Sequence, residues 1–198
     1  TSVTADSTGS VTVTAAGSTT ADSIDVSGET IVVTVSEEDA DMTFDGDGEA
    51  ADDSLTINAG DDFVATLEAG DAFETVTVTA SAATVATFDT TAADAYVGDA
   101  NTTFAGDEAM FDGKEVTGAA EVKITTLDDS DLTDVAEGIN INVNADAASK
   151  TLTVSNNARI EFSDVINTDA TILYTDGATA DAEDGVVTVE LNVASITG

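Results

Sequence analysis

Thr75-Val76-Thr77-Val78-Thr79 alternates hydroxyl-bearing and apolar residues without a break. Successive side chains of a β-strand point to opposite faces, so this stretch places valine on one face and threonine on the other. Both residues are β-branched and favour strands over helices. The stretch therefore predicts a strand that is buried on one face and solvated on the other.

The same alternation recurs along the chain, at 10–15, 30–35, 121–125, 139–144, 151–154 and 187–193. Gly-Asp and Asp-Gly pairs separate many of these segments, and both residues favour tight turns. Because antiparallel sheets commonly have one solvated face, we expect an all-β fold: an antiparallel β-sandwich or a jelly-roll-like arrangement, with at most one short helix. The one candidate helix spans 129–137, with acidic residues in its first turn and Gly138 after its end.

The chain of 198 residues suits a single β-sandwich domain over 1–198. A loose stretch at 17–23 follows the strand predicted at 10–15, so this strand either belongs to its own sheet or is exchanged between subunits. A shift in composition gives an alternative domain boundary near 101–118, because all four basic residues lie in the second half of the chain: Lys114, Lys123, Lys150 and Arg159.

Charge is the strongest feature of the composition: 40 Asp and Glu oppose 4 Lys and Arg, for a net charge of -36. A hydrophobic fraction of 42% favours a folded chain over a disordered one. The acidity excludes ordinary nucleic-acid binding and attraction to anionic lipid. No apolar run is long enough for a transmembrane segment. Self-repulsion implies help from outside the chain: bound cations, concentrated salt or a partner surface.

The residue types that are absent limit the chemistry. With no Cys and no His, the chain has no disulfide, thiolate or imidazole group. The stretch Phe88-Asp89-Thr90-Thr91-Ala92 faintly resembles the aspartic-protease loop, but Thr91 replaces its glycine and no second copy is present. Among 40 acids some pair always has glycosidase spacing, so the acids carry no specificity. We expect that the protein is not an enzyme.

Alternating carboxylates on a glycine-rich loop favour calcium, which takes six to eight oxygen ligands. The sharpest such group comprises Asp45, Asp47, Glu49, Asp52 and Asp53. Its spacing does not match an EF-hand. The group is interpreted either as a Ca²⁺ site or as a solvated acidic turn.

A second acidic group contains Asp128, Asp129 and Asp131. It is either a further Ca²⁺ site or favourable charge at the start of the predicted helix. Asn101 begins the sole Asn-x-Ser/Thr sequon and is a candidate glycosylation site in an exported protein.

By composition, this Thr-, Ala-, Asp- and Val-rich chain without Pro resembles acidic all-β proteins of prokaryotic surfaces: surface-layer subunits, calcium-dependent adhesin domains and strand-exchanged extracellular filaments. The resemblance implies export, cation dependence and self-assembly. We therefore expect an extracellular or cell-surface structural subunit, a homo-oligomer or homopolymer joined by strand complementation and divalent cations. The alternative is a monomeric calcium-dependent adhesin or carbohydrate-binding module, and a halophilic origin would explain the acidity equally well.

Overall fold

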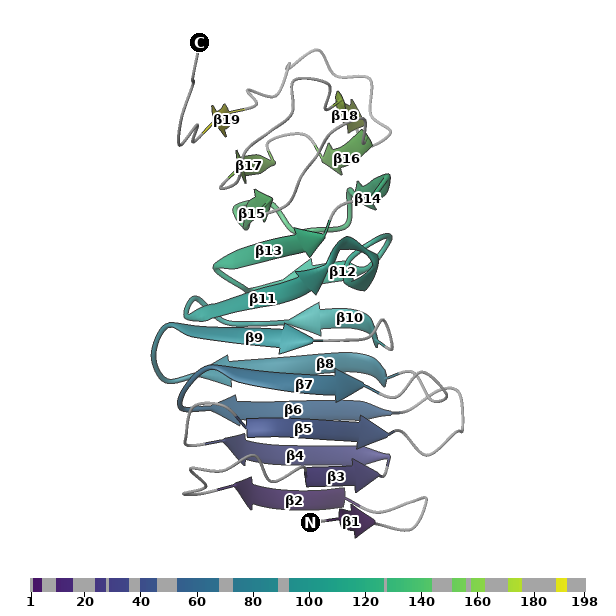
Figure 1. Cartoon of the computed structure of the whole chain (residues 1–198), viewed down its shortest axis with the longest axis vertical. Coiled ribbons are helices and arrows are strands. Elements are labelled where there is room, and N and C mark those ends of the chain that lie inside the picture. Colours follow the sequence, from purple (N-terminus) through teal and green to yellow (C-terminus); the bar gives the residue numbers. More distant parts are fainter. Residues whose placement is uncertain are drawn as a thin grey trace.

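The computed structural model describes residues 2–4, 10–15, 24–27, 29–35, 40–45, 53–67, 73–88, 93–126, 128–143, 151–155, 158–162, 171–175 and 188–191. These residues form a β-solenoid, in which strands of one sheet alternate along the chain with strands of the sheets opposite. The coils succeed one another along a rod (Figure 1). Each coil therefore contacts mainly the coils before and after it, as in other repeat architectures.

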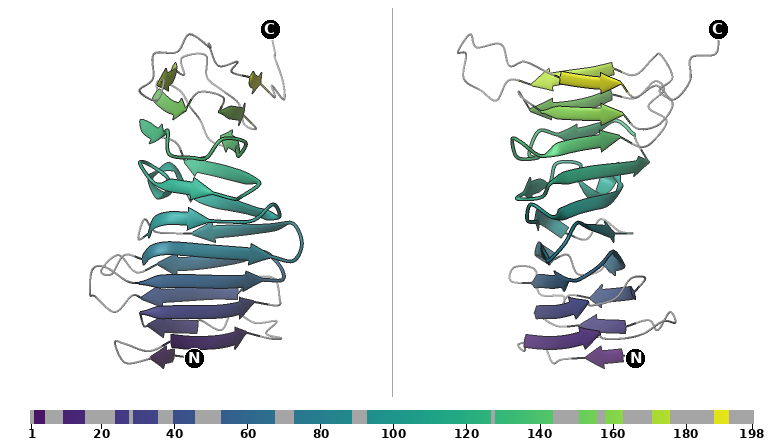
Figure 2. Two further views of the ribbon diagram at one scale, coloured as in Figure 1. Left: turned by 180° about the vertical axis from the view of Figure 1, so that it is seen from behind. Right: turned by 90° about the vertical axis from the view of Figure 1, so that its left-hand side faces the viewer.

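The odd-numbered strands form a ten-stranded sheet: β1 (Ser2–Thr4), β3 (Ile24–Ser27), β5 (Ala40–Asp45), β7 (Phe63–Leu67), β9 (Thr84–Phe88), β11 (Thr102–Asp107), β13 (Glu121–Thr126), β15 (Asn140–Val143), β17 (Arg159–Phe162) and β19 (Thr188–Leu191). Facing it is a six-stranded sheet of β2 (Ser10–Ala15), β4 (Thr30–Val35), β6 (Ser54–Ala59), β8 (Phe73–Ala80), β10 (Ala93–Val97) and β12 (Glu115–Thr117). A three-stranded sheet contains β14 (Ser130–Leu132), β16 (Thr151–Ser155) and β18 (Thr171–Thr175). Two further views show the same stacking (Figure 2).

The predicted all-β content is confirmed, but the predicted antiparallel sandwich or jelly roll is wrong. Every strand pair among the described residues is parallel, and neighbours in a sheet are separated by one coil of chain. Leu55 pairs with Val76, Val76 with Tyr96, and Tyr96 with Val116. In a solenoid one face of each parallel sheet is solvated, so the alternation that is typical of antiparallel strands appears in parallel ones.

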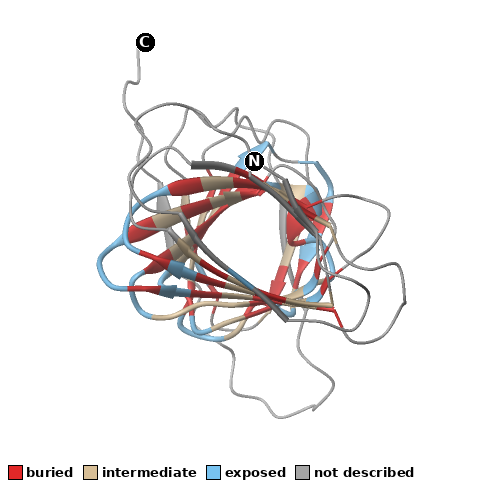
Figure 3. Cartoon of the chain, turned by 90° about the horizontal axis from the view of Figure 1, so that it is seen from below, coloured by how far each residue is buried: buried red, intermediate tan, exposed pale blue. Residues whose placement is uncertain are grey.

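The core lies between the facing sheets, and buried positions alternate with half-buried or exposed ones along β6, β7 and β9 (Figure 3). An aromatic cluster joins several coils. The ring of Phe88 lies 6.0 Å from that of Phe63 and 5.7 Å from that of Tyr96, whose ring lies 5.6 Å from Phe111. Burial of each such side chain contributes about 1.5–3 kcal/mol, so this cluster holds neighbouring coils together.

The helix predicted at 129–137 is wrong. Residues 130–132 form β14, and Val135 makes an isolated parallel bridge with Val116. Apolar positions 132 and 135 are both buried, and an apolar spacing of three suits a helix as well as a bent extended chain. The one helical element in the described residues is a 3₁₀ turn, η1 (Glu108–Met110), elsewhere in the chain.

The segment predicted as the first strong strand, 10–15, is β2, and it pairs in parallel register with β4 of the same chain. The alternative boundary at 101–118 contains β11 and β12. β11 pairs with β9 and β13, while β12 pairs with β10 and is bridged to Val135. Strand pairing therefore runs without a break through this region.

Candidate functional site

A row of charged residues follows one edge of the solenoid, where the strands of the six-stranded sheet begin. We call Glu29, Asp53, Glu74 and Asp94 the acidic ladder. The N–H of Glu74 donates to the carbonyl oxygen of Asp53 at 3.0 Å, and the residue after Asp53 donates to the carbonyl of Glu29 at 2.8 Å. The register of β8 with β10 sets Asp94 beside Glu74. At the end of the row, Nζ of Lys114 lies 3.0 Å from Oδ1 of Asp94.

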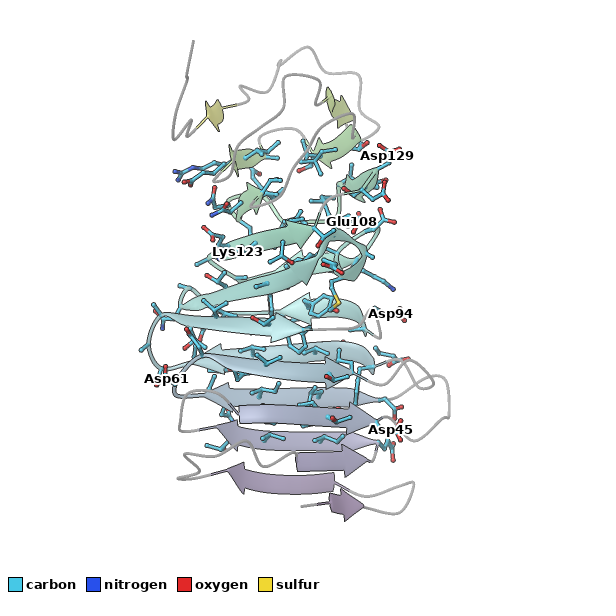
Figure 4. The ribbon with its side chains drawn as sticks, in the orientation of Figure 1. Asp45, Asp61, Asp94, Glu108, Lys123 and Asp129 are labelled. Carbon is cyan, nitrogen blue, oxygen red and sulfur yellow. The ribbon has the colours of Figure 1, made fainter. Side chains whose placement is uncertain are left out.

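The acidic ladder places carboxylates on successive coils, about 4.8 Å apart along the rod. Like charges directly opposite one another on neighbouring strands are destabilising. Figure 4 shows Asp94 on the same side of the view as Asp45, Glu108 and Asp129, with Asp61 on the other side. Glu74 and Asp94 are exposed and Glu29 is half-buried, whereas Asp53 is buried, so counter-cations reach the ladder at Glu29, Glu74 and Asp94.

Other aspartates accept hydrogen bonds from the backbone of an adjacent coil. Each of these bonds spans roughly one turn of the solenoid and satisfies a backbone N–H group of a strand residue. The three donor–acceptor pairs are Val85 N–H to Asp62 (2.7 Å), Ala80 N–H to Asp99 (2.9 Å) and Asp131 N–H to Asp112 (2.7 Å). We call these three hydrogen bonds the carboxylate brackets. They give some of the aspartates a structural role.

Asp99 is the most fully bonded bracket. One carboxylate oxygen accepts from the Ala80 N–H, and the other accepts from the Asn101 N–H at 2.9 Å and the Thr102 hydroxyl at 3.0 Å. Partial burial alone raises the pKa of Asp99, but the hydrogen bonds from Ala80, Asn101 and Thr102 together outweigh it and leave the pKa below its ordinary value. The folded protein thus favours the charged form of this side chain.

Glu108 shows the opposite behaviour. Burial raises its pKa, and repulsion from Asp128, Asp107 and Asp112 raises it further, against a hydrogen bond from the Ala109 N–H that lowers it. The structure therefore brings the predicted group at 128–131 beside acids of η1 and its flanks that sequence reasoning did not select. The signal was present, because Asp107, Glu108 and Asp112 lie about one coil before that group.

The first predicted calcium group is described only at its two ends. Asp45 ends β5 in the ten-stranded sheet, and Asp53 is buried just before β6 in the six-stranded sheet. The structure therefore sets these two residues on different sheets. Asp47, Glu49 and Asp52 lie outside the described residues.

The second predicted group lies at the start of β14. Asp128 accepts from the Asp129 N–H at 2.9 Å, and Asp131 accepts from the N–H and hydroxyl of Thr133 at 3.0 and 2.7 Å. These are local turn contacts of the kind that aspartate makes without a metal. Within the described residues, no three acidic side chains gather closely enough to hold a metal ion.

Asn101, the sequon residue, is exposed in the turn between β10 and β11. Its side-chain amide donates to the carbonyl oxygen of Ala80 at 3.0 Å, and its backbone N–H donates to Asp99. The side chain thus belongs to the same inter-coil contact as the Asp99 bracket. Glycosylation at this position remains a prediction.

A polar network lies on the outer side of the ten-stranded sheet and was not predicted. The Asn140 amide donates to Glu121 at 2.9 Å and to Glu161 at 3.4 Å, and the Asn142 amide donates to Glu121 at 3.3 Å. These residues come from β13, β15 and β17, which are consecutive in the sheet. The alternation Asn140-Ile141-Asn142 indicated an outward polar face, but only the register shows which acids lie opposite.

Comparison with protein-family models, with curated proteins and with solved structures finds no match for this chain. No helix within the described part of the chain has the length and apolar character needed to cross a membrane.

Proposed function

We propose that this chain is a structural, non-catalytic subunit of an extracellular or cell-surface assembly, in which copies associate once cations neutralise their carboxylates. The acidic ladder is the observation that carries the proposal. Its accessible members, Glu29, Glu74 and Asp94, give the rod a charged edge, and the strands that carry the ladder lie about 4.8 Å apart. Two such edges repel each other strongly unless counter-ions lie between them.

Divalent cations fit this edge best when two copies share them. Ca²⁺ takes six to eight oxygen ligands, whereas the described residues of one chain gather no complete set. Carboxylates from two facing rods would supply the missing ligands. The mechanism is mechanical: the solenoid provides a stiff rod, and cations join the rods along their acidic edges.

The test is to follow assembly of the intact chain by electron microscopy and sedimentation, in NaCl and in CaCl₂ at the same ionic strength. We expect larger assemblies in CaCl₂ that dissolve when EDTA is added. A chain that stays monomeric in both salts at every protein concentration contradicts the proposed function. Equal assembly in both salts supports general charge screening and contradicts calcium bridging.

The network around Asn140 favours a second candidate, a monomeric carbohydrate-binding or adhesive module. Amide and carboxylate groups on the outer face of a sheet are groups that can hydrogen-bond sugar hydroxyls. Replacement of Asn140 and Asn142 by alanine should then abolish retention on an insoluble polysaccharide. Retention that is unchanged by the double replacement counts against this candidate.

A further inference from the structure

A lysine and an asparagine are neighbours on the outer face of the ten-stranded sheet. Lys123 of β13 and Asn142 of β15 are partners in the parallel register of these two strands. Both side chains are half-buried and point outward, because the residues before and after each of them belong to the core. In the described strands, no other lysine is in register with an asparagine.

The two side chains are within reach of each other. Neighbouring strands of a sheet lie about 4.8 Å apart, and lysine has a flexible four-carbon stem, so the Lys123 amine can reach the amide carbon of Asn142. Lys114 is paired with Asp94, whereas Lys123 makes no ion pair within the part of the chain that the structure describes. The Lys123 amine is therefore not held away from Asn142 by a carboxylate.

A glutamate contacts the amide nitrogen of Asn142. Oε1 of Glu121 accepts a hydrogen bond from Nδ2 of Asn142 at 3.3 Å, and Oε2 accepts one from Asn140 at 2.9 Å, which fixes the carboxylate. Glu121 lies two residues before Lys123 on the same strand, so both side chains are on the outer face. A carboxylate in this position can take a proton from the amine and give one to the amide nitrogen.

We propose that Lys123 and Asn142 form an intramolecular isopeptide bond, with Glu121 as the general acid–base catalyst. The bond between Nζ of Lys123 and Cγ of Asn142 forms, and the bond between Cγ and Nδ2 breaks. The two protons that the lysine ammonium loses pass through Glu121 to Nδ2, which leaves as an ammonium ion. Atoms and charge balance without an oxidant, a reductant or a further reactant.

The bond joins two consecutive strands of the sheet, β13 and β15, and therefore two successive coils. Coils of a solenoid contact mainly their neighbours, so a covalent link between two of them limits local separation of the rod. The link constrains the unfolded chain in the same way as a disulfide, in a protein that has no cysteine. It is a property of the single chain and does not depend on the proposed function.

Mass spectrometry of the denatured, intact chain tests the proposal. We expect the purified chain to be lighter than its sequence by one molecule of ammonia. Digestion after acidic residues, followed by fragmentation, should give a branched peptide in which Lys123 is joined to Asn142. A chain with the full mass of its sequence overturns the proposal.

Two variants remove the reacting groups. Lys123→Arg keeps the positive charge but removes the nucleophile, because a guanidinium group stays protonated. Asn142→Thr removes the amide and keeps a residue that favours strands. Both should have the full mass of their sequences. Lys114→Arg and Asn58→Thr make the same changes at a lysine and a strand asparagine that are not partners of this kind, and both should still lose ammonia.

Glu121→Gln tests the catalytic role, because it leaves Lys123 and Asn142 in place; circular dichroism checks that it is folded. We expect its ammonia loss, followed over time after purification, to be at least about a hundredfold slower than that of the parent chain. Equal rates overturn the role of Glu121. Ammonia loss that persists in Lys123→Arg indicates cyclisation of an asparagine on its own backbone and overturns the isopeptide bond. Loss of water, with Lys123 joined to Glu161, overturns the assignment of Asn142.

Discussion

Two glycines with positive φ show how closely neighbouring coils approach. Gly118 has φ 73° and Gly138 has φ 90°, a conformation that costs other residues about 1–2 kcal/mol. A Cβ atom on Gly118 would overlap the carbonyl oxygen of Gly98, whereas one on Gly138 would meet nothing within 4 Å. The same substitution therefore has two different physical costs at these positions.

We predict that Gly118→Ala lowers the melting temperature much more than Gly138→Ala. In the Gly138 variant the cost is the strain of positive φ alone, about 1–2 kcal/mol. In the Gly118 variant the coil that contains Gly98 must also move, which costs more. Thermal unfolding followed by circular dichroism measures both. Equal losses would contradict the close approach of Gly118 to Gly98.

The stability of the fold should depend on pH through Glu108. Its pKa is raised in the folded state by burial and by the neighbouring acids, so the folded protein favours the protonated form. Protonation of Glu108 therefore stabilises the fold at low pH, and this stabilisation is lost as pH rises through the folded pKa. Glu108→Gln should therefore raise the melting temperature at pH 7, and its advantage should shrink as pH falls through the raised folded pKa and be gone below the ordinary glutamate pKa. An advantage that grows toward low pH would contradict the assignment.

At the scale of elements, the carboxylate brackets join one coil to the next. We predict that Asp99→Ala costs about 1–3 kcal/mol, because it leaves the Ala80 and Asn101 N–H groups and the Thr102 hydroxyl without their acceptor. Asp94→Ala, which removes a surface ion pair with Lys114, should cost about 0–1 kcal/mol. Urea unfolding at pH 7 compares the two variants.

The pH dependence of the Asp99 bracket has the opposite sign to that of Glu108. Because the folded pKa of Asp99 is lowered, its stabilisation is present above the ordinary aspartate pKa and disappears as pH falls through the folded value. The difference between the parent chain and Asp99→Ala should therefore narrow in acid. A constant difference down to the lowest measurable pH would show that the bracket acts through packing alone.

The strands themselves could be predicted, but the way they pair could not. The segments at 10–15, 30–35 and 75–79 are β2, β4 and the centre of β8, because alternation reports burial on one face. Alternation is the same in parallel and antiparallel strands, so the direction of pairing needs long-range information. That information was present as buried positions 55, 76, 96 and 116, one in each coil, which is the repeat typical of a solenoid.

At the scale of the whole molecule, the predicted acidic loops supply only part of the candidate site. Asp45 and Asp53 were selected because they adjoin a glycine-rich acidic stretch, but the structure sets them on different sheets. The acidic ladder joins residues that lie 20 or more positions apart in sequence, such as Glu29, Asp53 and Glu74. Local spacing could not reveal a row that exists only after the coils are stacked.

The acidic ladder leads to a prediction about the whole fold. Glu74 is exposed and lies between carboxylates of the coils on either side, whereas Glu137 is an exposed glutamate in a turn outside the ladder. In about 0.01 M salt, where the Debye length is about 30 Å, Glu74→Gln should raise the melting temperature by a few degrees through relief of like-charge contacts. Glu137→Gln removes the same charge and should raise it less. In about 1 M salt the two variants should have the same melting temperature, because the salt already screens the repulsion that Glu74→Gln removes. If both variants gain equally in low salt, only the total charge matters, and the ladder has no special part in the stability of the rod.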